Sequence, residues 1–322
     1  EKITRDNIVE ILKKVFELYG YGPLETPIVE RFDVLSAKFG AGETSDAMKE
    51  TFKLKDQGSR ELGLRFDLTV PFSRFVAMNP NLKMPYKRYA IGEVFRDGPV
   101  KQGRYREFWQ CDVDVVGSKS MVADAELIEL TLDAFKKLKI DIKIKINNRK
   151  LLEGIMLDCG VKKDNLQNTI IIVDKKDKIG VKRVEEELSK INLPSDCVSK
   201  ILTYLKMKDD FDEVYGKLGR SLKNKIGREG LNELKELFSY FDNETLKNIK
   251  FDISLARGFA YYTGTLFEGY FKNKKITSSV CAGGRYDKMI GNFIGNNKEY
   301  PAVGISFGVD VISEIIKKDN KK

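Results

Sequence analysis

The sequence contains no histidine among its 322 residues. This absence excludes a catalytic triad with histidine, a zinc-protease motif of two histidines and a histidine general base within the chain. A G-x-x-x-x-G-K-[ST] loop is also missing, so side chains would have to hold any nucleotide phosphates. Chemistry that uses positioned charges stays open, and attack of a carboxylate on a phosphoryl group is one example.

Cysteine is scarce, and its spacing excludes further classes of site. The four cysteines lie far apart without a C-x-x-C pair, at Cys111, Cys159, Cys197 and Cys281. This spacing argues against a zinc ribbon or a disulfide framework and favours reduced, packed thiols, and no side-chain cluster predicts a resident metal. Because no apolar run approaches the length of a transmembrane helix and no signal-peptide pattern is present, we expect a cytoplasmic protein.

The composition is that of a globular enzyme with about two domains. Hydrophobic residues make up 42% of the chain and charged residues 33%. The net charge is +9, from 57 basic and 48 acidic residues. A polyanion partner such as RNA and a merely basic surface explain this charge equally well.

Hydrophobic periodicity predicts an α+β fold, in which an antiparallel sheet flanked by helices is interrupted by a mostly helical insertion. We expect three segments along the chain: a first part of the core at 1–148, a lysine-rich insertion at 149–250 and a second part of the core at 251–322. Helices are predicted at 4–19, at 120–138 and from about 309, and strands at 62–66, 140–146, 265–271, 276–282 and 303–307.

The segment FRDGPVKQGRYREFWQ, at 95–110, predicts the turn and returning strand of a β-hairpin whose first strand is YKRYAIGEVFR. Period-two alternation separates the side chains of the returning strand into two faces. One face is apolar and can pack on a core. The other carries Arg106, Phe108, Gln110, Asp112 and Asp114. This polar face suits a nucleotide and a small zwitterion, although an ordinary solvated strand face is the plainer interpretation.

The hairpin resembles motif 2 of class II aminoacyl-tRNA synthetases, and LARGFAYYTG at 255–264 resembles a segment peculiar to histidyl-tRNA synthetases. Further matching blocks follow the family's order over nearly the whole chain: GPLETPIVERFDVL with Pro27 (motif 1), GETSDAMKETFKLKDQGSRELGLRFDLTVPF, INNRKLLEGI, VDKKDKIG, AGGRYDKMIG and PAVGISFG. The resemblance implies a class II synthetase-type sheet, ATP-dependent activation of histidine with Mg²⁺, transfer to tRNA(His), and a homodimer formed around Pro27.

The resemblance also implies roles in ATP binding. Arg96 would hold the α-phosphate together with the substrate carboxylate, and Arg257 would hold it from the opposite side, in place of a metal. These two arginines are the predicted catalytic residues. Arg104 would contact the outer phosphates, and Phe108 would stack on adenine. Arginine suits these positions because its planar fork stays charged and binds oxyanions bidentately.

For histidine, the resemblance implies that Asp67, Thr69 and Gln110 hold the α-ammonium group. Asp114 and Tyr262 would meet the two imidazole nitrogens, which need an acceptor on one side and a hydroxyl on the other. Gly283, Gly284 and Gly304 would provide backbone clearance, with ordinary turns as the competing explanation. Tyr261 is better explained as a core aromatic.

Three departures from the family pattern keep an alternative open. Ala260 stands where the family usually has aspartate, Val311 stands where motif 3 usually has an arginine against adenine, and the sequence stops at Lys322 without the family's anticodon-binding domain. The alternative is a non-catalytic, synthetase-like, histidine-sensing regulatory subunit of ATP phosphoribosyltransferase. Such a subunit would be expected to have lost the three arginines and the double tyrosine. A non-enzymatic RNA-binding module is a third possibility, based on net charge.

Overall fold

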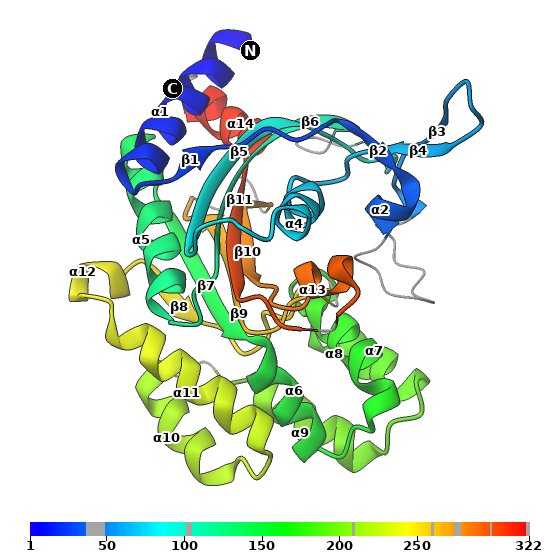
Figure 1. Cartoon of the computed structure of the whole chain (residues 1–322). Helices are drawn as coiled ribbons and strands as arrows, with labels where there is room; N and C mark the ends of the chain where they lie inside the picture. The colour runs from blue at the N-terminus through cyan, green and yellow to red at the C-terminus, as the bar shows by residue number, and fades with distance from the viewer. Residues whose placement is uncertain are drawn as a thin grey trace. The chain divides into compact units, whose positions relative to one another are not determined.

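The computed structural model describes residues 1–36, 49–100, 105–207, 210–258, 261–273, 278–296 and 298–319. The chain divides into two compact units (Figure 1). The first comprises residues 1–142 and 269–322, and the second comprises residues 143–268. The three-segment division expected from the sequence, with boundaries after residues 148 and 250, stays a prediction.

The first unit is built on a mostly antiparallel sheet with the strand order β1-β5-β6-β11-β10. These strands are β1 (Gly22–Pro23), β5 (Tyr86–Phe95), β6 (Glu107–Val116), β10 (Ser279–Arg285) and β11 (Ala302–Gly308). β1 pairs with β5 in parallel, and the other neighbours are antiparallel. The predicted hairpin is therefore confirmed as β5 and β6, and β6 is flanked on both sides by other strands.

Helices cover both faces of this sheet. Figure 1 shows α1 (Lys2–Leu18) and α5 (Val122–Lys137) on one side and α4 (Thr69–Met78) and α13 (Met289–Ile294) on the other. The aromatic core on the α1 and α5 side centres on Phe307 of β11, whose ring lies 5.5 Å from Phe16 and 5.8 Å from Phe135. On the other side, α4 and α13 meet where the Ser73 hydroxyl lies 3.1 Å from the Met289 sulfur.

A smaller sheet belongs to the same unit. It has the order β2-β4-β3 and consists of β2 (Val29–Arg31), β3 (Lys53–Lys55) and β4 (Glu61–Leu64). The short helix α2 (Phe32–Ser36) packs closely on it, because a Cβ atom at Gly63 would lie 2.8 Å from Leu35. β4 ends at Leu64, and the next backbone N–H, that of Arg65, donates to the Ile28 carbonyl at 2.9 Å, in line with the β2–β4 register.

The second unit is mostly helical, as predicted for 149–250. Its helices are α6 (Arg149–Asp158), α7 (Lys163–Asp174), α8 (Lys176–Lys190), α9 (Ser195–Leu205), α10 (Phe211–Ser221), α11 (Lys225–Ser239) and α12 (Asn243–Leu246). β7 (Ile142–Asn148) pairs in parallel with β8 (Ile249–Phe251). Helices α6 and α11 touch through glycine, since a Cβ atom at Gly154 would lie 2.3 Å from the Cα of Gly227.

The predicted core elements are found with small shifts in their ends. α1 begins two residues earlier than expected, α5 is the helix predicted at 120–138, and β9 (Thr265–Phe271) has the predicted bounds. The strand predicted at 276–282 is found as β10, three residues later, with residues 274–277 outside the described part. The helix predicted from about 309 is α14 (Val309–Asp319). In the described part of the chain, no helix is both long and apolar enough to span a membrane.

Candidate functional site

Strand β6 carries the predicted polar face in the middle of the first unit's sheet. Its register places Gln110 opposite Gly92 and Gly308, Asp112 opposite Ala90 and Ser306, and Asp114 opposite Arg88 and Gly304. Residues directly opposite one another in antiparallel strands project from the same face. Arg88 is therefore the single long side chain among the six neighbours, and the others leave space beside the β6 side chains.

Asp114 is held by two partners, Arg88 from β5 and Tyr286, which directly follows β10. The Arg88 Nη2 atom lies 2.7 Å from its Oδ2, and the Tyr286 hydroxyl donates to its Oδ1 at 2.5 Å. Asp114 is only 2% exposed, and burial raises the pKa of its carboxyl, although Arg88 and Tyr286 act in the opposite direction. Gly304 is required beside it, because a Cβ atom there would lie 1.9 Å from Oδ1.

Arg88 is fully buried, yet only part of its guanidinium is paired. Besides the contact with Asp114, its Nη2 donates to the Leu68 carbonyl at 3.1 Å, and its Cζ lies 4.3 Å from the Phe72 ring centroid. Its Nε and Nη1 atoms have no hydrogen-bonding partner among the described residues. A buried donor without a partner costs about 1 to 3 kcal/mol, so this arrangement is not optimised for stability alone.

Two further polar groups of β6 are buried and incompletely paired. The Oε1 atom of Gln110 and the Oδ1 atom of Asp112 accept no hydrogen bond from any described residue. Burial raises the pKa of Asp112 to about 7, with Arg88 acting against this shift and Asp114 acting with it. The face thus combines one cation, two carboxyls and an amide, with acceptors available to a polar ligand.

Arg96 and Phe108 lie together at the turn end of the hairpin. The Arg96 Cζ lies 4.2 Å from the ring centroid of Phe66 and 5.0 Å from that of Phe108, and its Nε donates to the Phe66 carbonyl at 3.3 Å. Phe108 also packs on a small cluster of buried residues formed by Leu68, Ala90 and Val94. The structure therefore brings together a cation and an aromatic ring, the pair expected to meet a nucleotide.

The segment before α4 carries the two residues predicted to hold an ammonium group. Thr69 is the first residue of the helix, and the Oδ1 atom of Asp67 accepts the Val70 N–H at 3.0 Å. Both side chains are partly exposed. Leu68 lies between them, and its carbonyl is the group bound by Arg88. Arg88 thus links this segment to Asp114.

The predicted glycines differ in their position on the sheet. Gly304 lies in the row of Asp114 and Gly284, whereas Gly283 pairs with Ile305 in the alternate row. All three glycines are buried. Clearance next to Asp114 is explained by Gly304, and the role of Gly283 stays a prediction.

In the second unit, Arg257 lies in an aromatic and acidic environment. Its Cζ lies 5.5 Å from the Tyr262 ring centroid, and its Nη1 lies 3.9 Å from the Glu268 carboxylate. Burial acts to lower the pKa of Arg257, but Tyr262, Glu268, Tyr261 and Asp174 together raise it, so the residue stays charged. The Nε and Nη1 atoms have no hydrogen-bonding partner among the described residues.

The backbone of Arg257 is also unusual, because its φ angle is +46°. A non-glycine residue in this region costs of order 1 to 3 kcal/mol, and such residues cluster at functional sites. Tyr262 is 7% exposed and packs with Leu255 and Leu266, and its ring centroid lies 4.5 Å from that of Tyr261. Arg104 and Ala260, both named from the sequence, lie outside the described residues.

Sequence reasoning missed Arg88 and Tyr286, which contact Asp114, and assigned no role to Asp112. A signal for Arg88 was present in the hairpin, because pairing the two strands around the turn determines which residue faces Asp114. Tyr286 directly follows the AGGR block, but 172 positions separate it from Asp114. No local pattern could have joined these two residues.

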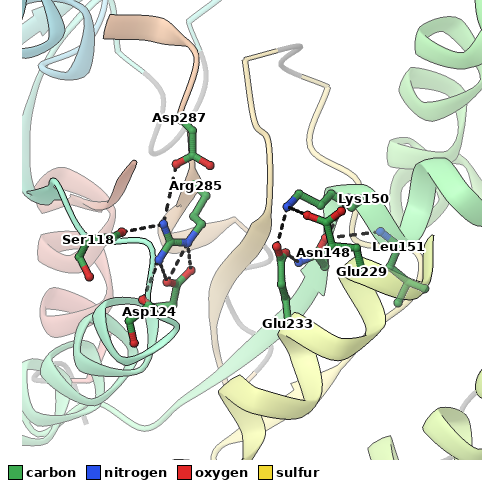
Figure 2. A network of polar contacts seen from close by, with 10 residues as sticks. Ser118, Asp124, Asn148, Lys150, Leu151, Glu229, Glu233, Arg285 and Asp287 are labelled. Atoms are coloured by element: carbon green, nitrogen blue, oxygen red, sulfur yellow. Dashed lines mark hydrogen bonds and ion pairs between the residues drawn. The ribbon is translucent and has the colours of Figure 1, made fainter. Parts of the chain in front are cut away.

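A second buried arginine of the same unit differs from Arg88. Figure 2 shows the Arg285 guanidinium against Asp124, with Nε to Oδ2 at 2.9 Å and Nη2 to Oδ2 at 2.6 Å. Its Nη1 donates to the Ser118 carbonyl at 3.0 Å, and its Nη2 also donates to the Ser120 carbonyl at 2.8 Å. All three nitrogens of this guanidinium are therefore used.

A separate polar network lies within the second unit and is also drawn in Figure 2. Lys150 contacts Glu229 at 2.5 Å and Glu233 at 2.6 Å, and the Asn148 side chain donates to Glu233 at 2.7 Å. Asn148 also caps α6 by accepting from the backbone of Lys150 and Leu151. These contacts join α6 to α11.

Comparisons with a family model and with known protein sequences indicate the same family. The family model described as histidyl-tRNA synthetase matches residues 2–312. Histidine--tRNA ligase 1 of Bacillus cereus is 44% identical over 318 residues, which cover 97% of this chain and 72% of that protein.

Two solved structures have closely similar folds. The histidyl-tRNA synthetase from Nostoc sp. PCC 7120 has a TM-score of 0.84 at 32% identity, covering 99% of this chain and 73% of that one. A Bacillus halodurans C protein described as an ATP phosphoribosyltransferase regulatory subunit/histidyl-tRNA synthetase has a TM-score of 0.81 at 25% identity, covering 97% and 79%.

Proposed function

The chain belongs to the histidyl-tRNA synthetase family, and we propose that it activates histidine with ATP and transfers the histidyl group to tRNA(His). The observation that carries this proposal is the face of β6, where buried acceptors of Gln110 and Asp112 lie between Phe108 and Asp114 without a described partner. Along β6, the Phe108 ring could stack on adenine, and the polar groups that follow it could bind the amino acid. This is the order in which an aminoacyl adenylate presents its two parts.

The chemical step joins two anions, so its transition state needs positive charge. The histidine carboxylate attacks the α-phosphorus of ATP, a P–O bond forms, and pyrophosphate leaves with the electron pair of the broken bond. We propose that Arg96 and Arg257 bind the α-phosphate oxygens as charge grows on them, while Arg104 binds the outer phosphates. Mg²⁺ would enter with ATP as part of the substrate. No histidine side chain is needed for this step.

Recognition of the amino acid would use both ends of the ligand. We propose that Asp67, Thr69 and Gln110 bind the α-ammonium group, while Asp114 and Tyr262 bind the imidazole nitrogens. Gly304 supports this assignment because it gives Asp114 room, whereas the proposed role of Gly283 rests on the family resemblance. The proposed partners are ATP, histidine, tRNA(His) and a second copy of the chain, and the proposed location is the cytoplasm.

A regulatory, non-catalytic role is the second candidate, and the similarity to the Bacillus halodurans protein is the observation that favours it. Such a protein would bind histidine without forming an adenylate. Arg96, Arg257 and Tyr262 are all present in this chain and favour the catalytic role.

Histidine-dependent exchange between ATP and pyrophosphate tests the proposal. We expect exchange in the parent, a loss of about 10²- to 10³-fold in Arg257→Ala, and partial recovery in Arg257→Lys, as for removal of one oxyanion donor. Arg220→Ala is a suitable control because Arg220 is exposed on α10. Histidine binding without exchange in the parent would support the regulatory role, and full activity of Arg257→Ala would refute the role of Arg257.

A further inference from the structure

We propose that Arg88 is a positioning residue of the histidine pocket: it keeps the buried Asp114 carboxylate ionised and holds it at a set distance from the ammonium-binding segment at residues 67–69. This inference rests on the proposed function and extends it, because Arg88 itself is assigned no contact with substrate. It acts through Asp114 and through the Leu68 carbonyl.

One nitrogen of Arg88 makes both contacts. Its Nη2 lies 2.7 Å from the Asp114 Oδ2 and 3.1 Å from the Leu68 carbonyl oxygen. Asp114 would bind the ring end of histidine, and the neighbours of Leu68 in sequence, Asp67 and Thr69, would bind the ammonium end. A single buried group therefore connects the two ends of the proposed pocket. Moving it would change the distance between them.

The guanidinium is kept in place by its surroundings. Arg88 is 0% exposed, and its Cζ lies 4.3 Å from the Phe72 ring centroid, on the same helix that begins at Thr69. The planar fork of arginine allows stacking and lateral hydrogen bonding at the same time, which a lysine ammonium does not. A lysine at this position would keep the charge but lose part of this geometry.

The electrostatic surroundings of Asp114 explain why it needs a cation. Burial raises the pKa of its carboxyl, the Asp67 carboxylate raises it further, and Asp112 lies two residues away on the same face of β6. Tyr286 donates to Asp114, and Tyr21 is a further ionisable group, whose pKa is raised by burial, by Glu126 and to a smaller extent by Asp114. Arg88 is the cation in contact with this carboxyl. Without it, the pKa of this carboxyl would rise further and the protonated form would be more stable than it is in the parent, and a protonated acid is a poorer acceptor for an imidazole N–H.

The partial use of Arg88 distinguishes this role from simple cross-linking. Arg285 uses all three nitrogens in protein contacts, whereas two of the three in Arg88 have no partner among the described residues. An arginine present only for stability would be expected to resemble Arg285. The geometry of Arg88 instead provides charge and position to one carboxylate and one carbonyl.

Calorimetric titration of histidine and of ATP into the full chain, from pH 6 to 9, tests the proposal. Arg88→Met keeps the length and removes the charge. We expect it to weaken histidine binding about 10- to 100-fold at pH 7.5, as for loss of a charge-assisted hydrogen bond, with less than a threefold change for ATP. We also expect histidine binding to be lost at a higher pH than in the parent as the pH falls, because Asp114 becomes protonated more easily. Ionisation of the ligand ring is the same in both proteins and cancels in the comparison.

Arg88→Lys and Arg285→Lys complete the design. Arg88→Lys should restore the parent pH profile but only part of the affinity. Arg285→Lys should change the unfolding midpoint without shifting the pH profile of histidine binding. Parent affinity and profile in Arg88→Met would overturn the proposal, as would equal losses for histidine and ATP. If Arg88→Met does not fold, parent affinity in Arg88→Lys overturns it. A parent that binds no histidine would instead refute the proposed function.

Discussion

Arg88 and Arg285 are two buried arginines of the same unit, each beside a buried carboxylate, and they solve the same electrostatic problem differently. The Arg285 guanidinium donates hydrogen bonds to Asp124 and to two backbone carbonyls. Arg88 serves two carboxyls, Asp114 by contact and Asp112 through its charge, and leaves donors unpaired among the described residues. A satisfied pair is what stability alone requires. The cluster around Arg88 instead leaves polar atoms unpaired among the described residues, which is consistent with the ligand-binding role proposed above.

The largest expected effect comes from breaking the satisfied pair. Arg285→Met would leave Asp124, which is 0% exposed, buried without its cation. We expect a loss of about 3 to 5 kcal/mol in the free energy of unfolding, measured by urea denaturation. Arg60→Met is a matched control, because Arg60 forms an exposed ion pair with Asp56 and should change stability little. A similar small change in Arg285→Met would mean that the pair is not a structural element.

The second prediction concerns the two carboxyls that share Arg88. Because the pKa of Asp112 is raised to about 7 in the folded protein, the folded state keeps this proton to a higher pH than the unfolded chain does. The contribution of Asp112 to stability is therefore greatest below its unfolded pKa, near pH 4, and falls as the pH rises towards 7. The contribution of Asp112 to this fall is at most about 4 kcal/mol, at about 1.4 kcal/mol per pKa unit.

Asp112→Asn removes this titration and keeps the shape of the side chain. The stability advantage of the variant over the parent should grow from pH 5 to pH 8, as measured by urea unfolding at both values, because only the parent must give up this proton on ionising in the folded state. If the difference between variant and parent is the same at pH 5 and pH 8, Asp112 titrates normally and the cluster is less strained than the structure indicates.

The third and smallest expected effect concerns the space beside Asp114. In Gly304→Ala, the new methyl group would lie 1.9 Å from the Asp114 Oδ1, so Asp114 must move away from Arg88 and Tyr286. We expect a loss of about 1 to 3 kcal/mol in stability, together with weaker histidine binding. Gly216→Ala is the control, because Gly216 lies on α10, where an added methyl group would have no neighbouring atom within 4 Å, and it should stabilise the helix by about 0.5 to 1 kcal/mol. Unchanged histidine binding in Gly304→Ala would argue against a role for Asp114.

Local patterns predicted the elements of this fold well. The hairpin of β5 and β6 followed from two alternating runs around Asp97-Gly98-Pro99, and the mostly helical insertion at 149–250 followed from its lysine-rich composition. The ends of elements were less certain because they depend on contacts outside the element. β4, for example, was predicted to reach Phe66 but ends at Leu64.

The candidate site was predicted only in part, because its burial also depends on contacts outside the strand that carries it. Alternation placed Phe108, Gln110, Asp112 and Asp114 on one face of β6, and the register confirms that face. Alternation also suggested that this polar face could be solvated, yet Asp112 and Asp114 are each 2% exposed. Burial depends on what covers a strand, which alternation does not report.

The sequence by itself determined the family, the order of the elements and the residue types available for chemistry, because these are carried by local motifs and by the absence of histidine. Only the tertiary structure determined which charged and polar groups lie close enough to interact. Arg88 meets Asp114 through the register of β5 on β6, Tyr286 meets it across a long sequence separation, and Gly304 leaves the space between them. The physical reason is that electrostatic energies and pKa values depend on distance and burial, and both are set by strands and helices that are remote in sequence.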